Sequence, residues 1–249
     1  MALHTLFPST VALEPISHKY YDAFNREYLS VTRFLKLLSE DFKDTLAYAR
    51  ASEETRAAWK KKGEDAANHG TRIHNALELY SLTGQVLEEN SHMTEAIKSI
   101  LSEYKGYYQS HDEICLHNDD FRLAGTADKV CLVGNRADSE FDLADFKTNI
   151  SKGIEYHSEY KKRMFYPIDH LQDCNFVKYS LQLSIYAYFF ELLTGRKLRK
   201  MWIHFIPPDD MMKHYKIPVM YMKSDVITLL NYHKASVYQS VEPMKMYEF

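Results

Sequence analysis

Residues 121–147 read FRLAGTADKVCLVGNRADSEFDLADFK and decide the fold. Within them, residues 121–133 and 140–147 are short and β-prone, and a Gly-Asn turn signal lies between them. A third segment of this kind, residues 111–118, precedes them across an Asn-Asp-Asp turn signal. The three segments predict an antiparallel meander.

Helices are expected before and after this meander. Residues 1–28 resemble an extended lead-in, and Ser30 is placed to cap a helix. The hydrophobic period then predicts helices over about 43–61, 64–82 and 92–109, with a break near Gly63. After the meander we expect an irregular segment (148–174), a long apolar helix (175–194) ended by Gly195, two strands (200–206 and 215–221) and a helix (223–238). This order predicts an α/β or α+β core with a helical N-terminal annex.

Composition excludes several classes of protein. The chain has 249 residues, 45% hydrophobic and 26% charged, which is unlike collagen or a disordered chain. No apolar run approaches the roughly 20 residues that cross a bilayer, and the first residues lack a signal-peptide pattern. We therefore expect a cytoplasmic protein without membrane contact. Three scattered cysteines (Cys115, Cys131, Cys174) do not suit a disulfide framework or a four-cysteine iron–sulfur cluster.

Charged side chains gather on two neighbouring strands of the predicted meander. Asp145 and Lys147 project from the same side of one strand because side chains alternate along it. Asp128 lies on the strand before, where Gly125 and Thr126 allow close backbone approach. Two carboxylates on adjacent strands can share one Mg²⁺. Taken alone, an Asp-x-Lys pair on a strand is more often a surface ion pair.

Two helices carry further polar pairs. His74 and Glu78 lie four residues apart on one face of the helix that contains HGTRIHNALELY. Gln182 and Tyr186 share a face of the long apolar helix in the same way. Each pair alone would suit an ordinary amphipathic helix.

Together, the four elements resemble the RecB-like, lambda-exonuclease-like branch of the PD-(D/E)XK nuclease superfamily. That branch has, in order, a GT-x-x-H helix, a G-T-x-D strand, a (D/E)-x-K strand and a Q-x-x-x-Y helix. This chain supplies GTRIH, GTAD, DFK and QLSIY between residues 70 and 186. The resemblance implies a single domain over 1–249 with a restriction-endonuclease-like core at 63–222, a helical annex at 1–62, and a C-terminal helix and tail at 223–249.

The resemblance also implies roles for individual residues. His74, Asp128, Asp145 and the backbone carbonyl of Phe146 would hold one or two Mg²⁺ or Mn²⁺ ions, and Lys147 would be the catalytic lysine. Gln182 and Tyr186 would face DNA near the scissile phosphate, while Glu78 and Thr126 would support the site. The chain departs from many relatives in having Asp145 where they have Glu. It also lacks the four cysteines with which some relatives hold an iron–sulfur cluster.

The net charge of −3 means that any grip on DNA must be local. Within the irregular segment, basic residues alternate with aromatic ones, which would suit single-stranded DNA ends. The residues are Lys152, Lys161, Lys162 and Arg163, with Tyr156, Tyr160, Phe165 and Tyr166. A solvated loop with packed tyrosines explains the same pattern equally well.

The expected function is that of a metal-dependent DNA exonuclease in recombination, repair or replication, in a bacterium or a phage-infected cell. The alternatives are a structure-specific DNA or RNA endonuclease and a non-catalytic DNA-binding module with the same fold. The chain carries no G-x-x-x-x-G-K-[ST] motif, so a helicase would be a separate partner, as would an annealing protein or a second copy.

Overall fold

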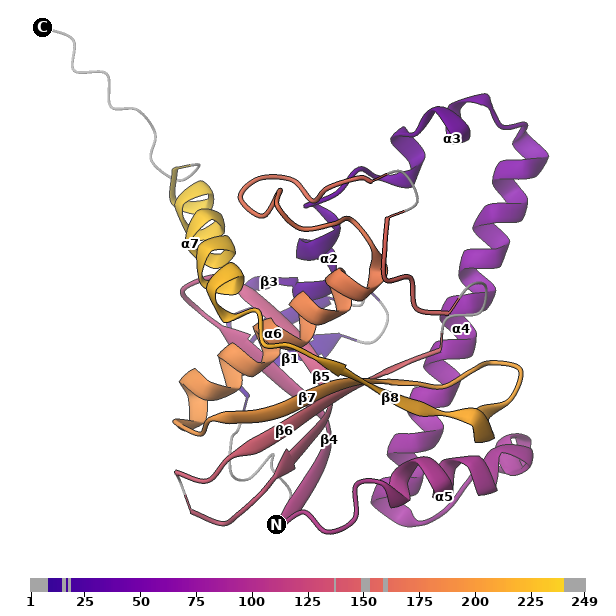
Figure 1. Cartoon of the computed structure of the whole chain (residues 1–249), viewed down its shortest axis with the longest axis vertical. Coiled ribbons are helices and arrows are strands. Elements are labelled where there is room, and N and C mark those ends of the chain that lie inside the picture. The colour runs from indigo at the N-terminus through magenta and orange to yellow at the C-terminus, as the bar shows by residue number, and fades with distance from the viewer. Residues whose placement is uncertain are drawn as a thin grey trace, which may run out of the picture.

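The computed structural model describes residues 9–14, 17, 19–136, 138–148, 153–158 and 161–239. In these ranges the chain forms one eight-stranded mixed sheet that helices flank (Figure 1). The strands are β1 (Val11–Glu14), β2 (Lys19–Asp22), β3 (Glu27–Ser30), β4 (Gln109–Asn118), β5 (Leu123–Leu132), β6 (Phe141–Lys147), β7 (Leu198–Phe205) and β8 (Tyr215–Val219). This architecture confirms the predicted fold class, a mixed sheet flanked by helices.

The helices fall before, between and after the strands. They are α2 (Val31–Lys36), α3 (Leu46–Arg50), α4 (Glu53–Thr83), α5 (Thr94–Ser102), α6 (Asn175–Thr194) and α7 (Lys223–Gln239), with 3₁₀ turns η1 (Phe42–Asp44), η2 (Glu88–Met93) and η3 (Met211–Lys213). None of the described helices is both long and apolar enough to span a bilayer. Helix α6 ends as predicted at Gly195, whose φ of 71° lies in the left-handed region.

Strand β5 is the centre of the sheet. It pairs antiparallel with β4 and with β6, which confirms the predicted meander. On the edge away from β4, β3 pairs only with Leu123 and Ala124, and β6 pairs only with residues 129–132. The sheet then continues from β6 through a parallel β7 to an antiparallel β8. Helix α6 forms the crossover that two parallel neighbours need.

Two cores cover the two faces of the sheet, as the alternation of side chains requires. Val130 and Leu143 lie in the larger core, which α2, α6 and α7 cover. The adjacent residues Cys131 and Ala144 lie in the second core, which α4 and α5 cover. Strands β5 and β6 are therefore buried on both faces, which explains their largely apolar sequences, whereas β4 is mostly half-buried and more polar.

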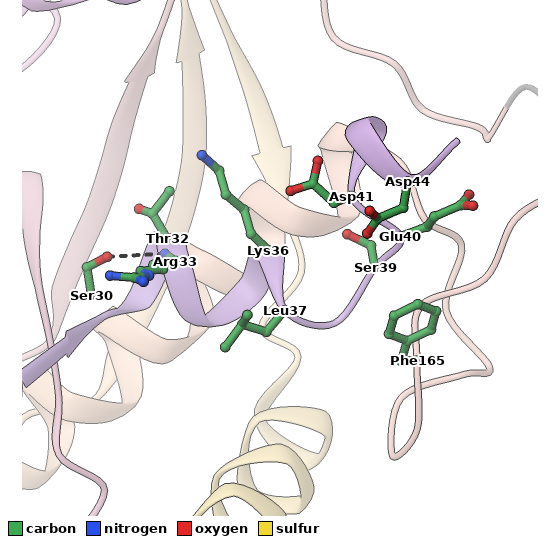
Figure 2. Close-up of a pocket in the computed structure, with 10 residues that line it drawn as sticks. All are labelled: Ser30, Thr32, Arg33, Lys36, Leu37, Ser39, Glu40, Asp41, Asp44 and Phe165. Carbon is green, nitrogen blue, oxygen red and sulfur yellow. Dashed lines mark hydrogen bonds between the residues drawn. The ribbon is translucent and has the colours of Figure 1, made fainter. Parts of the chain in front are cut away.

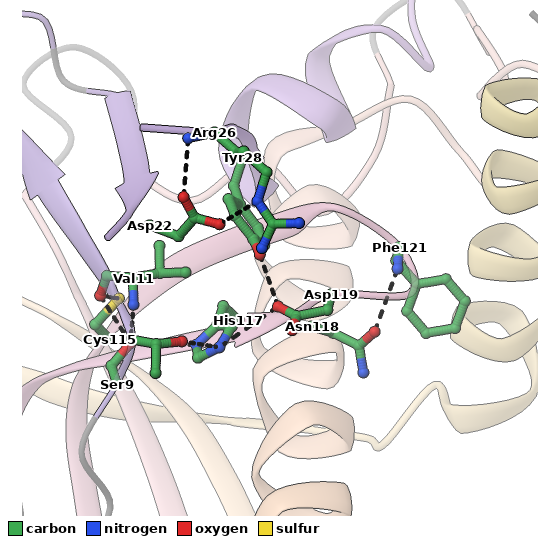
Figure 3. Close-up of polar contacts among 11 residues, drawn as sticks. Ser9, Val11, Asp22, Arg26, Tyr28, Cys115, His117, Asn118, Asp119 and Phe121 are labelled. Atoms are coloured by element: carbon green, nitrogen blue, oxygen red, sulfur yellow. Dashed lines mark hydrogen bonds and ion pairs between the residues drawn. The ribbon is translucent and has the colours of Figure 1, made fainter. Parts of the chain in front are cut away.

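The N-terminal segment differs from the predicted lead-in. Its described residues include three paired strands, β1 to β3. The first described helix begins at Val31 with Ser30 as its N-cap, as predicted. The described residues of the predicted annex (1–62) therefore form strands followed by helices, and are not helical throughout. The Tyr28 hydroxyl donates to Asp119 at 2.7 Å, and the Cys115 thiol donates to the Val11 carbonyl at 3.3 Å (Figure 3). These contacts join segments about a hundred residues apart, which local sequence patterns cannot show.

Helix α4 corrects a second prediction. The expected helices over 43–61 and 64–82 are instead two short turns and one 31-residue helix that passes through Gly63. A glycine weakens a helix by about 1 kcal/mol, and Ser52 and Gly84 supply clear end caps here. The next helix is also shorter than the predicted 92–109, because α5 ends at Ser102.

Candidate active site at the fork between β5 and β6

The predicted acidic residues meet where two strands separate. Strand β6 pairs with β5 as far as Ala144 and then continues beside β7 to Lys147. Across the opening, the Phe146 backbone N–H donates to Oδ2 of Asp128 at 2.6 Å. We call this opening, with Asp128, Asp145, Phe146 and Lys147, the fork. Its carboxylates come from neighbouring strands, as the sequence predicts.

Asp145 is buried and poorly satisfied. Its side chain is 2% exposed, and apart from the Lys147 ammonium neither carboxylate oxygen has a hydrogen-bond donor among the described residues. Its one charged contact is an ion pair with the Lys147 ammonium. Burial raises the pKa of Asp145 to about 6, against the opposing effect of Lys147. Buried carboxylate oxygens normally have several hydrogen-bond donors, so the two oxygens of Asp145 can accept a further ligand.

Lys147 remains charged in this setting. Burial alone would lower its pKa, but the negative charges of Asp145 and Asp128 raise it. Its ammonium also lies 4.8 Å from the centre of the Tyr179 ring, a favourable cation–π geometry. A fixed positive charge therefore lies beside the carboxylates.

Helix α4 brings His74 to the fork. Its Nε2 lies 3.1 Å from the Phe146 carbonyl oxygen, and its Nδ1 lies 3.6 Å from Oδ1 of Asp128. Burial alone would lower the pKa of His74, but the negative charges of Asp128 and Glu113 raise it to about 9. His74, Asp128 and the Phe146 carbonyl are thus brought together as predicted.

Glu113 is a site residue that the sequence does not reveal. It lies on β4, and its Oε1 is 3.7 Å from Nδ1 of His74. Its φ of 51° is uncommon for a residue other than glycine, and such strain is concentrated at functional sites. Glu113 belongs to the segment HDEICLHN, but its position beside His74 depends on the register between β4 and β5, which the sequence does not show.

The donor set fits a divalent cation. Single ligand atoms of His74, Glu113 and Asp128 lie within 4.8 Å of one another. Asp145, a predicted ligand, lies outside this group of converging atoms, although the charges of Asp128 and His74 act on its carboxylate. Burial and the charge of Glu113 raise the pKa of Asp128, although His74 opposes them, so these acids repel one another in the metal-free chain. A set rich in oxygen with one imidazole suits Mg²⁺ or Mn²⁺.

Tyr186 is buried, contrary to the expectation that it faces DNA. It is 2% exposed, and a Cβ at Gly125 would lie 2.5 Å from its ring. Its hydroxyl accepts a hydrogen bond from Nε2 of Gln182 at 3.2 Å. Tyr186 therefore packs against the backbone of β5 and holds Gln182, which is half-buried. Gly125 is needed because no larger residue allows this approach.

The two supporting residues have different surroundings. Thr126 shares a hydrogen bond of 2.9 Å with the Tyr20 hydroxyl, so it links the fork strand to β2. Glu78 lies about one turn of α4 beyond His74 and is half-buried. Within the described part of the chain it has no hydrogen bond or ion pair, and it lies outside the group of ligand atoms around His74. A supporting role for Glu78 stays a prediction.

The basic loop makes its contacts within the protein. Lys162 forms an ion pair of 2.6 Å with Glu40, and Nη1 of Arg163 donates to the His170 carbonyl at 2.5 Å. Lys161 is exposed and has a φ of 54°. Lys152 and Tyr160 lie outside the described residues. Phosphate binding by this loop stays a prediction.

A groove of about 670 Å³ lies beside this loop, between α2 and Phe165 (Figure 2). Its rim carries both signs of charge, Arg33 and Lys36 against Glu40, Asp41 and Asp44. The residues that line it include none of those at the fork. Mixed charge of this kind does not favour a phosphate backbone.

Comparisons with known proteins add little to the geometry. No protein-family model matches the sequence, and none of the curated proteins matches it. The structure is similar to the crystal structure of a protein from Eubacterium rectale described as "Putative exonuclease". The two share 13% sequence identity and a TM-score of 0.40, over 85% of this chain and 79% of the other. A likeness at this level carries no argument about activity.

Proposed function

We propose that the protein is a metal-dependent nuclease of the RecB-like branch of the PD-(D/E)XK superfamily, and that it degrades DNA from an end. One observation carries the proposal. At the fork, His74 lies 3.6 Å from Asp128, and the charges of both act on a buried Asp145 whose only donor among the described residues is the Lys147 ammonium. The same residues make up the motifs GTRIH, GTAD and DFK, in the order typical of that branch.

The residues at the fork have separate tasks. Asp128, Asp145, Glu113, His74 and the Phe146 carbonyl would hold one or two divalent cations. A bound Mg²⁺ or Mn²⁺ lowers the pKa of water and neutralises charge on a phosphate. Lys147 would orient the attacking water and stabilise the negative charge that grows on the phosphoryl oxygens. Gln182, held by Tyr186, would contact the substrate next to the cleaved bond.

Cleavage is expected to leave a 5′-phosphate and a 3′-hydroxyl, as the family resemblance implies. Binding to DNA ends would use the loop in which aromatic residues alternate with basic ones. A helicase, an annealing protein or a second copy as partner stays a prediction from the sequence.

The test uses end-labelled linear DNA and closed circular DNA, each single- and double-stranded, together with labelled RNA. The wild type and Lys147→Ala are compared with Mg²⁺, with Mn²⁺ and with EDTA. Metal-dependent loss of linear DNA alone, abolished in the variant, would support the proposal. Cleavage of circles would indicate an endonuclease instead. No cleavage of DNA or RNA by the folded wild type with either metal would overturn the nuclease proposal.

A further inference from the structure

A second group of metal-ligand side chains lies on the other face of the sheet from Asp145. His204 on β7 pairs in register with Phe146, so its side chain lies on the face opposite to that of Asp145. His214, between η3 and β8, and Glu103, at the end of α5, complete the group. One ligand atom from each of the three lies within 4.8 Å of the others. This group is separate from the fork.

The three ligand atoms converge closely. Nε2 of His204 lies 2.8 Å from Nδ1 of His214, which in turn lies 3.2 Å from Oε1 of Glu103. His204 is fully buried, and Glu103 is at the surface. The group is therefore buried at one end and open to an ion from solvent at the other.

Each histidine is held by a hydroxyl at its remaining nitrogen. Nδ1 of His204 lies 2.7 Å from the Tyr104 hydroxyl, and Nε2 of His214 lies 3.0 Å from Oγ of Ser99. The Tyr104 oxygen also accepts the indole N–H of Trp202 at 3.3 Å. Such outer contacts orient the imidazoles of metal sites.

The metal-free group has too few protons for its acceptor atoms. Each neutral imidazole carries one N–H, and two ring nitrogens and a carboxylate oxygen face one another here. If Nε2 of His204 donates to Nδ1 of His214, the Glu103 oxygen faces a lone pair 3.2 Å away. If Nδ1 of His214 carries the proton, the other two atoms compete for it. A single cation would satisfy all three atoms together.

We propose that Glu103, His204 and His214 form a second metal site, which takes a transition ion such as Zn²⁺ and joins α5 to the β7–β8 hairpin. Two imidazoles and one carboxylate are ligands that Zn²⁺ accepts, with water in the fourth position. Mg²⁺ prefers oxygen ligands and would bind poorly here. The inference stands on geometry and does not depend on the proposed nuclease activity.

Lys216 limits the affinity of this site and offers a sharp control. Its ammonium lies 3.1 Å from Oε2 of Glu103, and it also lies over the Tyr104 and Trp202 rings. A bound divalent cation would be repelled by this charge. Replacing Lys216 should therefore strengthen metal binding. If Glu103, His204 and His214 formed only a hydrogen-bond network and no metal site, the same replacement would not increase the affinity for a metal ion.

The experiment first removes the fork as a competing site. In full-length Asp128→Asn/Asp145→Asn protein, Zn²⁺ binding is measured by calorimetry, and Co²⁺ binding by visible absorption. We expect one ion per chain and a Co²⁺ spectrum typical of four-coordinate nitrogen and oxygen ligands. His214→Ala should abolish both signals, Glu103→Gln should weaken binding by at least about tenfold, and Lys216→Met should tighten it.

Circular dichroism of each variant checks that it is folded. If His214→Ala does not fold, Glu103→Gln is the variant that tests the site. Absence of a stoichiometric ion in the double variant would overturn the proposal. Binding that is unchanged by both His214→Ala and Glu103→Gln would do so as well, since it would place the ion elsewhere.

Discussion

Two buried Asp–Lys pairs lie in the same meander, and they differ in how well they are satisfied. Lys129 on β5 donates to both carboxylate oxygens of Asp112, at 2.7 and 2.9 Å, and the Ser81 hydroxyl adds a third hydrogen bond at 2.5 Å. Asp145 has only its ion pair with Lys147. Both pairs are almost fully buried.

The difference separates a structural ion pair from a reactive one. A buried charge is stable when hydrogen bonds replace the water that it has lost, as they do at Asp112. The carboxylate of Asp145 lacks them and lies beside Asp128, so a cation would relieve both. A buried Asp–Lys pair alone is therefore weak evidence for a catalytic site, and unsatisfied oxygens are what distinguish Asp145.

The largest expected effect is on activity. Lys147→Ala and Asp145→Asn should each lower the rate of DNA cleavage by at least about a thousandfold, because each removes charge that acts in the transition state. Lys129→Met, assayed at a temperature where it is folded, should retain most of the wild-type rate. Comparable losses in Lys129→Met and Lys147→Ala would contradict the division of roles.

For stability we expect the opposite order, with a larger loss on replacing Lys129 than on replacing Lys147. Lys129→Met leaves the buried Asp112 carboxylate without its cation and should lower the free energy of unfolding by about 3 kcal/mol. Lys147→Met should cost less, because the pKa of Asp145 is already about 6 and the carboxyl group can take up a proton. Urea unfolding of both variants at pH 7 in EDTA measures the difference, and equal costs would show that both pairs are structural.

Substitution at Gly125, where the backbone of β5 closely approaches Tyr186, should have a smaller effect than substitution of either lysine. Gly125→Ala places a methyl group 2.5 Å from the Tyr186 ring, and we expect a loss of about 2 kcal/mol in unfolding free energy. Because Tyr186 holds Gln182, the KM for DNA should also rise.

Gly63→Ala is the matched control for this substitution. Nothing lies within 4 Å of a Cβ at Gly63, in the middle of α4, so this change should raise stability by about 0.5–1 kcal/mol. If both glycine variants lost similar stability, contact with Tyr186 would not be the cause at Gly125.

The smallest expected effect is the pH dependence of metal binding. The pKa of Asp145 is about 6 and that of His74 about 9, so protons compete with the metal for both groups. The affinity for Mn²⁺ should rise by about tenfold or more between pH 5 and pH 8. Calorimetry in buffers of different ionisation heat would also show proton release on binding.

The metal-free protein should respond to pH in the opposite sense. Both groups have a higher pKa in the folded chain than in the unfolded chain, so folding favours their protonated forms. Stability in EDTA should fall between about pH 4 and pH 6 as Asp145 ionises, and again between about pH 6.5 and pH 9 as His74 loses its proton. Asp145→Asn should reduce the first decline, to which Asp128 also contributes because its pKa is raised, and should keep the second.

Much of the fold and of the candidate site can be read from local patterns. The short β-prone runs and the Gly-Asn turn signal in residues 121–147 identify β5 and β6, and the alternation of side chains along a strand places Asp145 and Lys147 on one side. The apolar run before Gly195 identifies α6. These features depend on neighbours in the sequence, and so do the motifs that contain His74 and Asp128.

Other features depend on contacts between distant segments, and local patterns miss them. The pairing of β1–β3 into the sheet, the burial of Tyr186 against Gly125 and the place of Glu113 beside His74 are of this kind. The unbroken α4 is a further case, since its end caps and packing outweigh the weak preference of Gly63.

Residue order alone is thus enough to name His74, Asp128, Asp145 and Lys147 as groups of the candidate site, but not Glu113, because motif spacing and side-chain alternation act over a few residues. Only the folded chain distinguishes Asp145 from Asp112, since hydrogen bonds to Asp112 come from α4 and β5 while Asp145 faces the opening of the fork. It also brings Glu103, His204 and His214 together from three elements. The number of hydrogen-bond donors around a buried carboxylate depends on which segments pack against it, and the pairing of the whole sheet determines those segments.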